Sequence, residues 1–227
     1  GMAHTAYAGG MIMLLDSLLD LLFPPRCVGC QRRGALLCLR CRATCRRVPA
    51  AANAQQHARL ASPYLRSTAG AYIFEGAVRE AIHTLKYNRR VRVAAPLGEL
   101  LAHYLIEQAI QIDAIVPVPL HADRQRKRGF NQSMLLAQQL AVRTKLPVLT
   151  TELKRIRHTA QQADLNREQR RANVTGAFMW QASTLPPRRV LILDDVLTTG
   201  ATVEAAAQAL CRAGAVEVHA LALARGL

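Results

Sequence analysis

Apolar residues along this chain form short uninterrupted runs that alternate with longer segments in which they recur every three or four positions. The runs at 113–118 and 190–194 are apolar at nearly every position, which is typical of strands buried on both faces of a parallel sheet. Strand patterns also occur at 70–75, 147–150 and 216–224, and helical patterns at 77–87, 97–109, 132–145 and 202–212. Because strands and helices alternate, the sequence predicts an α/β fold with a central parallel sheet flanked by helices.

The part of the chain before this sheet divides into two expected segments. Residues 11–23 predict an amphipathic helix that two prolines then stop and that packs on the body of the protein. The run is too short to cross a bilayer, and its acidic polar face disfavours an interfacial membrane helix, so we expect a cytoplasmic protein without a transmembrane segment. Residues 48–62 have no clear period and predict a linker or a partly frayed helix. The expected division is 11–48 for the helix and a small cysteine-containing module, 49–63 for the linker and 64–227 for the α/β domain.

Composition and charge narrow the possible partners. The 227 residues are 51% hydrophobic, which excludes a disordered chain, and they carry a formal net charge of +15 with only 4% aromatic residues. Basic residues gather around the cysteines and at 86–92, 124–128 and 154–171. The group around the cysteines contains no acid, which favours a polyanion such as single-stranded nucleic acid over the alternative of arginines that are merely solvated. Because stacking platforms are scarce, such binding is expected to be electrostatic and to weaken as salt increases.

Four cysteines near the amino terminus have the spacing of a metal site. Cys27 and Cys30 form one Cys-x-x-Cys pair, and Cys38 and Cys41 form a second pair after seven intervening residues. Four thiolates suit a closed tetrahedral Zn²⁺ site, and so small a module has almost no core without its metal. A redox dithiol pair and an iron–sulfur cluster are the alternatives. Cys45 is an extra thiol that could replace Cys41 or stay free.

The run from 190 to 202 carries the clearest chemical signal. A buried strand ends in two carboxylates, Asp194 and Asp195, and a turn of hydroxyl residues and glycine then opens an alanine-rich helix. Backbone N–H groups of the turn and the positive end of the helix dipole suit phosphate oxygens. The carboxylates suit a sugar diol, directly or through Mg²⁺ and its waters. The loop after the strand at 113–118 lies at the same edge of the sheet, where open α/β sheets bind ligands.

The run resembles the phosphoribosyl pyrophosphate (PRPP) loop of type I phosphoribosyltransferases, and three further stretches narrow the resemblance. These are Pro117-Val118-Pro119-Leu120-His121 with Arg124 and Arg128-Gly129-Phe130-Asn131-Gln132; Arg157-His158-Thr159-Ala160-Gln161-Gln162 with Leu165, Arg170, Asn173-Val174 and Gly176-Ala177-Phe178; and Lys86-Tyr87 with Arg90. Together with the cysteines, this set resembles the ComF/GntX family, which is associated with competence and DNA uptake. The resemblance extends roughly from Cys27 to the carboxyl terminus, and it implies a type I phosphoribosyltransferase-like fold.

The resemblance also implies roles for individual residues. The PRPP-binding loop is expected to consist of Asp194, Asp195, Val196, Leu197, Thr198, Thr199, Gly200, Ala201 and Thr202, in which the acids hold the ribose and the turn holds the 5-phosphate. The loop that approaches the pyrophosphate is expected to consist of Val118, Pro119, Leu120 and His121. A mobile segment at 154–173 is expected to close over the bound sugar. Candidate residues for charge neutralisation or closure are Arg155, Arg157, Thr159, Gln162, Arg170, Lys86 and Arg128.

Two functions from different classes follow. The first is Mg²⁺-dependent transfer or hydrolysis at C1 of PRPP, with an acceptor that the sequence does not identify. The second is a module that binds PRPP without turnover and holds single-stranded DNA, or a protein of the competence machinery, through its zinc finger and basic surface. The acidic pair favours ligand binding in both, and the arginines around the cysteines favour the second.

Overall fold

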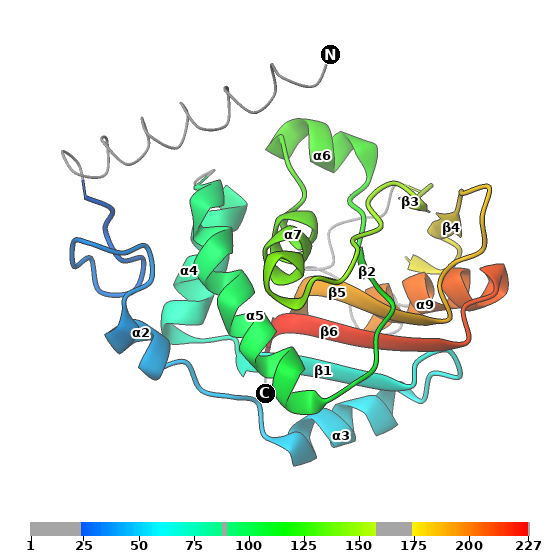
Figure 1. Cartoon of the computed structure of the whole chain (residues 1–227), viewed down its shortest axis with the longest axis horizontal. Coiled ribbons are helices and arrows are strands. Elements are labelled where there is room, and N and C mark those ends of the chain that lie inside the picture. Colours follow the sequence, from blue (N-terminus) through cyan, green and yellow to red (C-terminus); the bar gives the residue numbers. More distant parts are fainter. Residues whose placement is uncertain (1–23, 88–89, 158–173, 227) are drawn as a thin grey trace.

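A four-stranded parallel sheet forms the centre of the protein, which a computed structural model describes at residues 24–87, 90–157 and 174–226 (Figure 1). The strands lie in the order β1-β6-β5-β2. Their bounds are β1 (Ser67–Ile73), β2 (Ala114–Pro117), β5 (Arg189–Leu197) and β6 (Glu217–Arg225). The predicted α/β architecture with a parallel sheet is therefore confirmed.

Helices cover both faces of this sheet. The longer helices are α4 (Gly76–Tyr87), α5 (Ala94–Gln108), α7 (Gln132–Thr144) and α9 (Ala201–Ala213), and a 3-10 turn, η1 (Val91–Val93), leads into α5. Figure 1 shows α4, α5 and α7 in front of the sheet and α9 behind it. Leu191 and Leu221 pack with the front helices, whereas Ile192 and Val218 pack with α9. The alternation of side chains along each strand thus supplies two cores, one for each face.

The register of β2 and β5 brings two predicted loops to one edge of the sheet. Pro117 is paired with Leu193, so the residues after both strands leave the sheet side by side. Asn131 fixes this arrangement, because its Nδ2 donates to the Val118 carbonyl at 3.0 Å while its Oδ1 accepts from the Ser133 amide at 3.0 Å. Asn131 therefore caps α7 and ties the start of that helix to the end of β2.

The segment expected as a linker or a frayed helix contains an ordered helix, α3 (Ala50–Leu60), which packs against β1. Asn53 on this helix is buried, and its side-chain amide both donates to the Gly70 carbonyl at 3.1 Å and accepts from the Gly70 amide at 3.0 Å. The side chain thereby takes the place of a neighbouring strand along the exposed edge of β1. Of the two predictions for residues 48–62, the structure contains the helix. This helix packs against the sheet and is part of the body of the protein.

Several short elements differ from the sequence expectations. The pattern at 147–150 predicts a strand, but only a single bridge forms, between Val148 and Ile115. Besides η1, four elements were not predicted: α2 (Leu39–Ala43), α6 (Ala122–Arg128), β3 (Leu153–Arg155) and β4 (Phe178–Trp180), of which β3 and β4 form a separate antiparallel pair. The helix expected at 11–23 lies outside the described residues. Within the described part, no helix is both long enough and apolar enough to cross a membrane.

Candidate functional site

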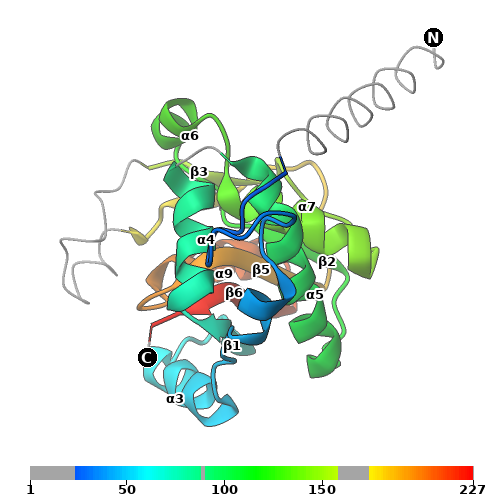
Figure 2. The ribbon, with the colours of Figure 1, turned by 90° about the vertical axis from the view of Figure 1, so that its left-hand side faces the viewer.

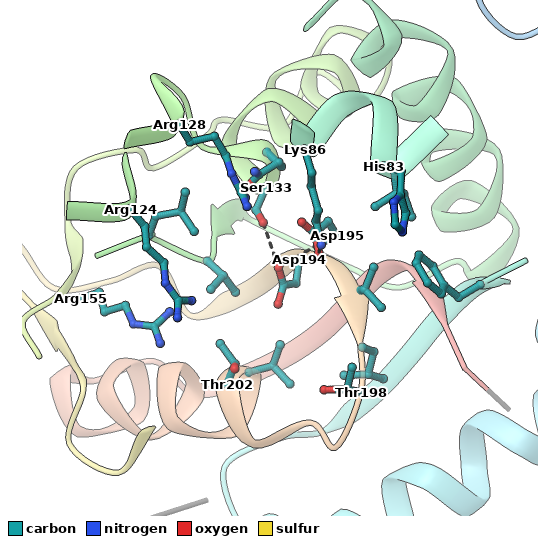
Figure 3. A pocket seen from close by; sticks show the side chains of 18 of the residues that line it. His83, Lys86, Arg124, Arg128, Ser133, Arg155, Asp194, Asp195, Thr198 and Thr202 are labelled. Carbon is teal, nitrogen blue, oxygen red and sulfur yellow. Dashed lines mark hydrogen bonds and ion pairs between the residues drawn. The ribbon is translucent and has the colours of Figure 1, made fainter. Parts of the chain in front are cut away.

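A cavity of about 380 Å³ opens at the carboxyl ends of β2 and β5 (Figure 3). Its walls come from the loop after β2, the turn after β5, helices α4, α6 and α7, and β3. Of the residues predicted for the site, Val118, Leu120, Asp194, Asp195, Val196, Leu197, Thr198, Gly200, Thr202, Lys86, Arg128 and Arg155 line this cavity. The fold therefore brings together side chains that are far apart in the sequence.

The two aspartates at the end of β5 already have partners within the protein. Asp195 is buried and its Oδ1 accepts from Lys86 Nζ at 2.8 Å. Oδ1 of Asp194 accepts from Ser133 Oγ at 2.9 Å and from the Asp195 amide at 2.8 Å. Figure 3 shows the pair between Ser133 and Lys86 on one side and the threonines of the turn on the other. Each carboxylate is thus held in one orientation before any ligand arrives.

Burial of the Asp194 carboxyl group and the negative charge of Asp195 raise the pKa of Asp194 to about 7. The Asp195 amide, Lys86 and Ser133 oppose this shift. The pair therefore carries between one and two negative charges near neutral pH, and a cation or a hydrogen-bond donor that enters the cavity favours the fully ionised form.

Replacing Asp194 with asparagine is expected to stabilise the empty protein at alkaline pH. The pKa of Asp194 in the folded protein lies above the ordinary value for aspartate. Between about pH 4 and 7 the folded state therefore keeps a proton that the unfolded chain has lost, and the free energy of unfolding falls as pH rises through this window. The asparagine side chain keeps the carbonyl oxygen that accepts from Ser133 and loses the charge. We expect the melting temperature of Asp194→Asn to exceed that of the wild type by at least about 2 °C at pH 8, with a smaller difference at pH 5.

Asp113→Asn is the matched comparison, with the opposite sign. The pKa of Asp113 is lowered by hydrogen bonds from Arg189, whose Nη2 lies 2.6 Å from Oδ1. The stability that this pair contributes is present above the ordinary pKa of aspartate and is lost as pH falls through the folded value. Asp113→Asn should therefore melt below the wild type at pH 8. An Asp194→Asn protein that also melts below the wild type at pH 8 would show that its carboxylate stabilises the fold.

The turn between β5 and α9, residues 197–202, is held in place by α3. Gly200 has a φ of 85° and caps the start of α9. The positive φ favours glycine, and a Cβ atom at this position would also make a tight contact, 3.1 Å from Leu60 Cδ2. Gln56 Nε2 donates to the Thr199 carbonyl at 3.2 Å and to the Thr198 carbonyl at 3.4 Å. The side chain of Thr199 accepts from the Ala201 amide at 3.4 Å, whereas Thr198 and Thr202 line the cavity.

Three arginines form the wall opposite the threonines. Arg124, Arg128 and Arg155 all line the cavity, and Figure 3 shows their side chains extending toward the acidic pair. The Arg128 guanidinium lies over the Tyr87 ring at 5.7 Å, and that of Arg155 lies over the Phe178 ring at 5.4 Å. Burial and the charge of Arg124 lower the pKa of Arg155 to about 10, so Arg155 remains a cation at neutral pH. The aromatic rings restrict both guanidinium groups.

Other predicted residues lie outside the cavity or outside the described chain. Arg157 is exposed and its Nη1 donates to the Thr175 carbonyl at 2.5 Å, away from the cavity lining. Neither Pro119 nor His121 belongs to the described lining, and His121 caps α6 by accepting from the Asp123 amide at 3.3 Å. Thr159, Gln162 and Arg170 lie outside the described residues, as does most of the segment expected to close over a ligand.

Sequence reasoning missed several side chains of the wall. Ser133 and Gln132 reach it from the first turn of α7, and His83 reaches it from the helix face that also carries Lys86 and Tyr87. The position of Ser133 two residues after the Asn131 cap was a usable signal, since residues in the first turn of a helix that begins near a strand end can point toward the ligand edge of the sheet.

A family model described as phosphoribosyl transferase domain matches residues 97–227, which is more than half of the chain and includes the acidic pair and both loops. The chain belongs to this family.

Curated proteins similar to this chain carry names that refer to competence or to DNA utilization. The chain is 42% identical over 115 residues to competence protein F of Haemophilus influenzae, and the match covers 50% of each chain. It is 39% identical over 153 residues to the DNA utilization protein YhgH of Salmonella typhimurium, covering 64% of this chain and 66% of that one. It is 31% identical over 131 residues to competence protein ComFC of Streptococcus pneumoniae, covering 57% and 56%. The chain thus spans half to about two thirds of the length of these relatives, and the resemblance to the ComF/GntX family is confirmed.

Ahead of the phosphoribosyl transferase domain, four cysteines converge in the cysteine module, defined here as residues 24–48. The sulfur atoms of Cys27, Cys30, Cys38 and Cys41 all lie within 4.8 Å of one another, as the predicted zinc ligands should. Four sulfurs at these separations fit one tetrahedral ion, for which Zn²⁺ is the expected metal in a closed site. Although burial raises the pKa of Cys27, amides of Cys38, Cys30 and Gly29 that donate to its sulfur lower the pKa to about 6, which favours the thiolate.

Two neighbouring residues limit the alternatives for this metal site. Cys45, which sequence reasoning left as a possible replacement for Cys41, lies outside the group, and its Sγ donates to the Cys41 carbonyl at 3.2 Å. A Cβ atom on Gly29 would lie 2.9 Å from Cys41 Sγ, so glycine keeps space for the fourth ligand. The structure therefore supports the set that the two Cys-x-x-Cys pairs predict.

The cysteine module lies beside α4 and α5 (Figure 2), and both apolar and ionic contacts fix it to the α/β body. Cys27 and Leu37 are buried in the same core as residues of α4 and α5. Arg42 pairs with Glu99, Arg46 with Glu75 at 2.5 Å, and Arg47 with Glu107 at 3.0 Å. Three of the arginines near the cysteines therefore bind the module to the domain, whereas Arg26, Arg32, Arg33 and Arg40 are exposed.

Proposed function

We propose that the cavity binds PRPP with Mg²⁺ and that the protein is a phosphoribosyltransferase-like component of DNA uptake or utilization. The observation that carries the proposal is the acidic pair near the carboxyl end of β5, beside the end of β2, with arginines and a threonine turn in the same cavity (Figure 3). Membership of the phosphoribosyl transferase domain family supports the ligand, and the names of the competence and YhgH relatives support the cellular role.

The distribution of charge matches the parts of PRPP. The turn at 197–202 opens α9 and offers hydroxyls and the positive end of a helix to the 5-phosphate. The carboxylates of Asp194 and Asp195 face the middle of the cavity, where they can accept hydrogen bonds from the ribose hydroxyls. Arg124, Arg128 and Arg155 supply positive charge for the pyrophosphate. The ligand would therefore lie across the edge of the sheet, with its most highly charged group at the arginine wall.

The carboxylates and the pyrophosphate would also provide the oxygen ligands that Mg²⁺ requires, and the bound ion would neutralise charge that grows on the leaving group. Lys86 holds Asp195 in place and contributes a further positive charge. The arginine wall would stabilise pyrophosphate as its bond to C1 breaks. We propose that the phosphoribosyl group of PRPP is transferred through C1 to an acceptor, or that the bond between C1 and the pyrophosphate is hydrolysed by water.

The arginine wall can be tested with a matched pair of variants. Arg155→Met removes a largely buried cation from the cavity but keeps the length of the side chain, and we expect calorimetry to show Mg²⁺·PRPP binding weakened by about tenfold or more. Arg157→Met is the control, because Arg157 is only two residues away but is exposed and bonded to Thr175, and it should change affinity by less than about twofold. Equal effects of the two variants would remove Arg155 from the proposed pyrophosphate site.

A second candidate function is a module that binds PRPP without turnover and holds single-stranded DNA or a competence-machinery partner. The exposure of Arg26, Arg32, Arg33 and Arg40 on the cysteine module favours it, because exposed cations can reach a polyanion, whereas Arg42, Arg46 and Arg47 are already paired with glutamates.

Fluorescence anisotropy with a labelled oligonucleotide tests this candidate. We expect the logarithm of the affinity to fall with the logarithm of the salt concentration, with a slope of roughly 0.7 per phosphate contacted, and we expect Arg32→Ser/Arg33→Ser to lower that slope. Arg188→Ser/Arg212→Ser, which removes the same number of charges at exposed positions outside the cysteine module, is the control for net charge. Binding that is independent of salt, or equal losses from both changes, would argue against the cysteine module as the binding surface.

A further inference from the structure

A second cavity of about 380 Å³ lies between α3, α5 and the sheet, and it shares no lining residue with the acidic cavity. The strand register explains its floor. Ser67, His219 and Leu191 form one row across β1, β6 and β5, and Ala69 pairs with Leu221 in the next row on the same face. The row at Ser67 lies at the amino ends of the strands, whereas the acidic cavity lies at their carboxyl ends. The second cavity is therefore a separate site, and Leu191, Ala69 and Leu221 make much of its floor apolar.

The polar groups of this cavity carry hydrogen-bonding capacity but little net charge. Arg47 and Glu107, which both line it, pair with each other at 3.0 Å. His219 Nδ1 lies 2.7 Å from Ser67 Oγ, and its Nε2 lies 3.0 Å from Glu217 Oε1. In the neutral tautomer that donates from Nε2 to Glu217, Nδ1 accepts from the Ser67 hydroxyl, which leaves the oxygen lone pairs of Ser67 for a donor in the cavity.

This chemistry favours a neutral molecule with a planar ring and N–H groups. The apolar side chains of the floor suit the face of a ring, and the Arg47–Glu107 pair leaves little net charge for an ion. The buried Arg47 Nη1, which has no hydrogen-bond partner among the described residues, suits a ring acceptor, and the Ser67 oxygen suits a ring N–H or an amino group. His57 adds an imidazole to the rim, with its Nδ1 3.3 Å from Thr68 Oγ1. A volume of about 380 Å³ is within the range of small-molecule sites. Nucleobases and nucleosides have these properties.

Helix α3 connects this cavity to the acidic cavity. Asn53, Ala54 and His57 line the second cavity from one face of the helix. The neighbouring face carries Gln56, which donates to the carbonyls of Thr198 and Thr199, and Leu60, which packs against Gly200. A ligand that shifts α3 therefore also moves the groups that hold the turn at 197–202.

We propose that the second cavity is an effector site for a neutral nitrogen heterocycle of the nucleobase or nucleoside class, coupled through α3 to the turn at 197–202. Binding of the heterocycle to the second cavity does not depend on what the acidic cavity binds. An effect of the heterocycle on PRPP affinity rests on the proposed function. Occupancy would change PRPP affinity because Gln56 and Leu60 set the position of the turn.

Two-dimensional amide NMR of the zinc-loaded full chain, titrated with uracil and with hypoxanthine, tests the binding without PRPP. For at least one probe we expect saturable shifts of Ser67, Ala69 and His219, accompanied by a shift of Gly200. Ala54→Phe fills the cavity from an exposed helical position and should abolish these shifts. Ala58→Phe is the matched control, since Ala58 is exposed on the same helix outside the cavity lining, and it should leave them unchanged.

Gln56→Ala tests the coupling. It should preserve the shifts of Ser67 and His219 and reduce that of Gly200, and where PRPP binds, the probe should change wild-type PRPP affinity by about fivefold. Absence of shifts in the second cavity with both probes, or equal loss in Ala54→Phe and Ala58→Phe, would overturn the proposed site. Probe binding with no PRPP binding would overturn only the proposed function of the acidic cavity.

Discussion

Cys30→Ser is expected to lose the metal and to lower the melting temperature by roughly 10 °C. Cys30 is an exposed member of the four-sulfur group, so the substitution removes a ligand without disturbing the core directly. The loss of stability follows because a bound metal would order the loops that carry Cys27 and Leu37, and these residues fill part of the core beside α4 and α5. Elemental analysis should find about one Zn²⁺ per wild-type chain and almost none in the variant.

Cys45→Ser is the matched control for this prediction. Cys45 lies in the same module but outside the sulfur group, so this variant should keep about one Zn²⁺ per chain and melt close to the wild type. Iron in place of zinc would correct the metal assignment. Loss of metal in Cys45→Ser but not in Cys30→Ser would contradict the ligand set.

Gly200→Ala is expected to destabilise the protein by about 3 kcal/mol and to abolish Mg²⁺·PRPP binding. At a φ of 85°, an alanine is strained by about 1–2 kcal/mol. In addition, its Cβ atom would lie 3.1 Å from Leu60 Cδ2, so the buried Leu60 side chain or the turn must shift by a few tenths of an ångström. Chemical denaturation measures the first effect and calorimetric titration the second.

Gly129→Ala separates strain from displacement of the turn. Gly129 has a φ of 83°, but a Cβ atom there would meet nothing within 4 Å. It should therefore show the strain of about 1–2 kcal/mol alone and retain PRPP binding. If Gly200→Ala resembled Gly129→Ala in both measurements, the contact between α3 and the turn would have no part in holding the site.

Much of the fold and of the site could be predicted because the relevant signals are local. The apolar run before Asp194 identifies a buried parallel strand, and the carboxyl ends of such strands form the ligand edge of an α/β sheet. The spacing of Cys27, Cys30, Cys38 and Cys41 likewise identifies a metal site without any long-range information. In each case the residues that carry the chemistry lie within a few positions of the element that places them.

The remaining features depend on contacts between distant segments. The amide pairing of Asn53 with Gly70 makes α3 an integral element, although its own sequence has no clear period. Ser133 and His83 enter the cavity because α7 and α4 pack beside the end of β5, which no local pattern specifies. The pairing of Arg42 with Glu99, 57 residues later, also cannot be predicted from the local sequence. It shows that part of the basic cluster around the cysteines binds the module to the rest of the protein.

The most direct test of the account is a calorimetric titration of Mg²⁺·PRPP into the zinc-loaded wild type and into Asp194→Asn/Asp195→Asn. The account predicts saturable binding at one site per chain in the wild type and none in the folded double variant, because both carboxylates face the centre of the cavity. Absence of binding by a folded, zinc-loaded wild type, or equal binding by both proteins, would contradict the assignment of the acidic cavity to PRPP.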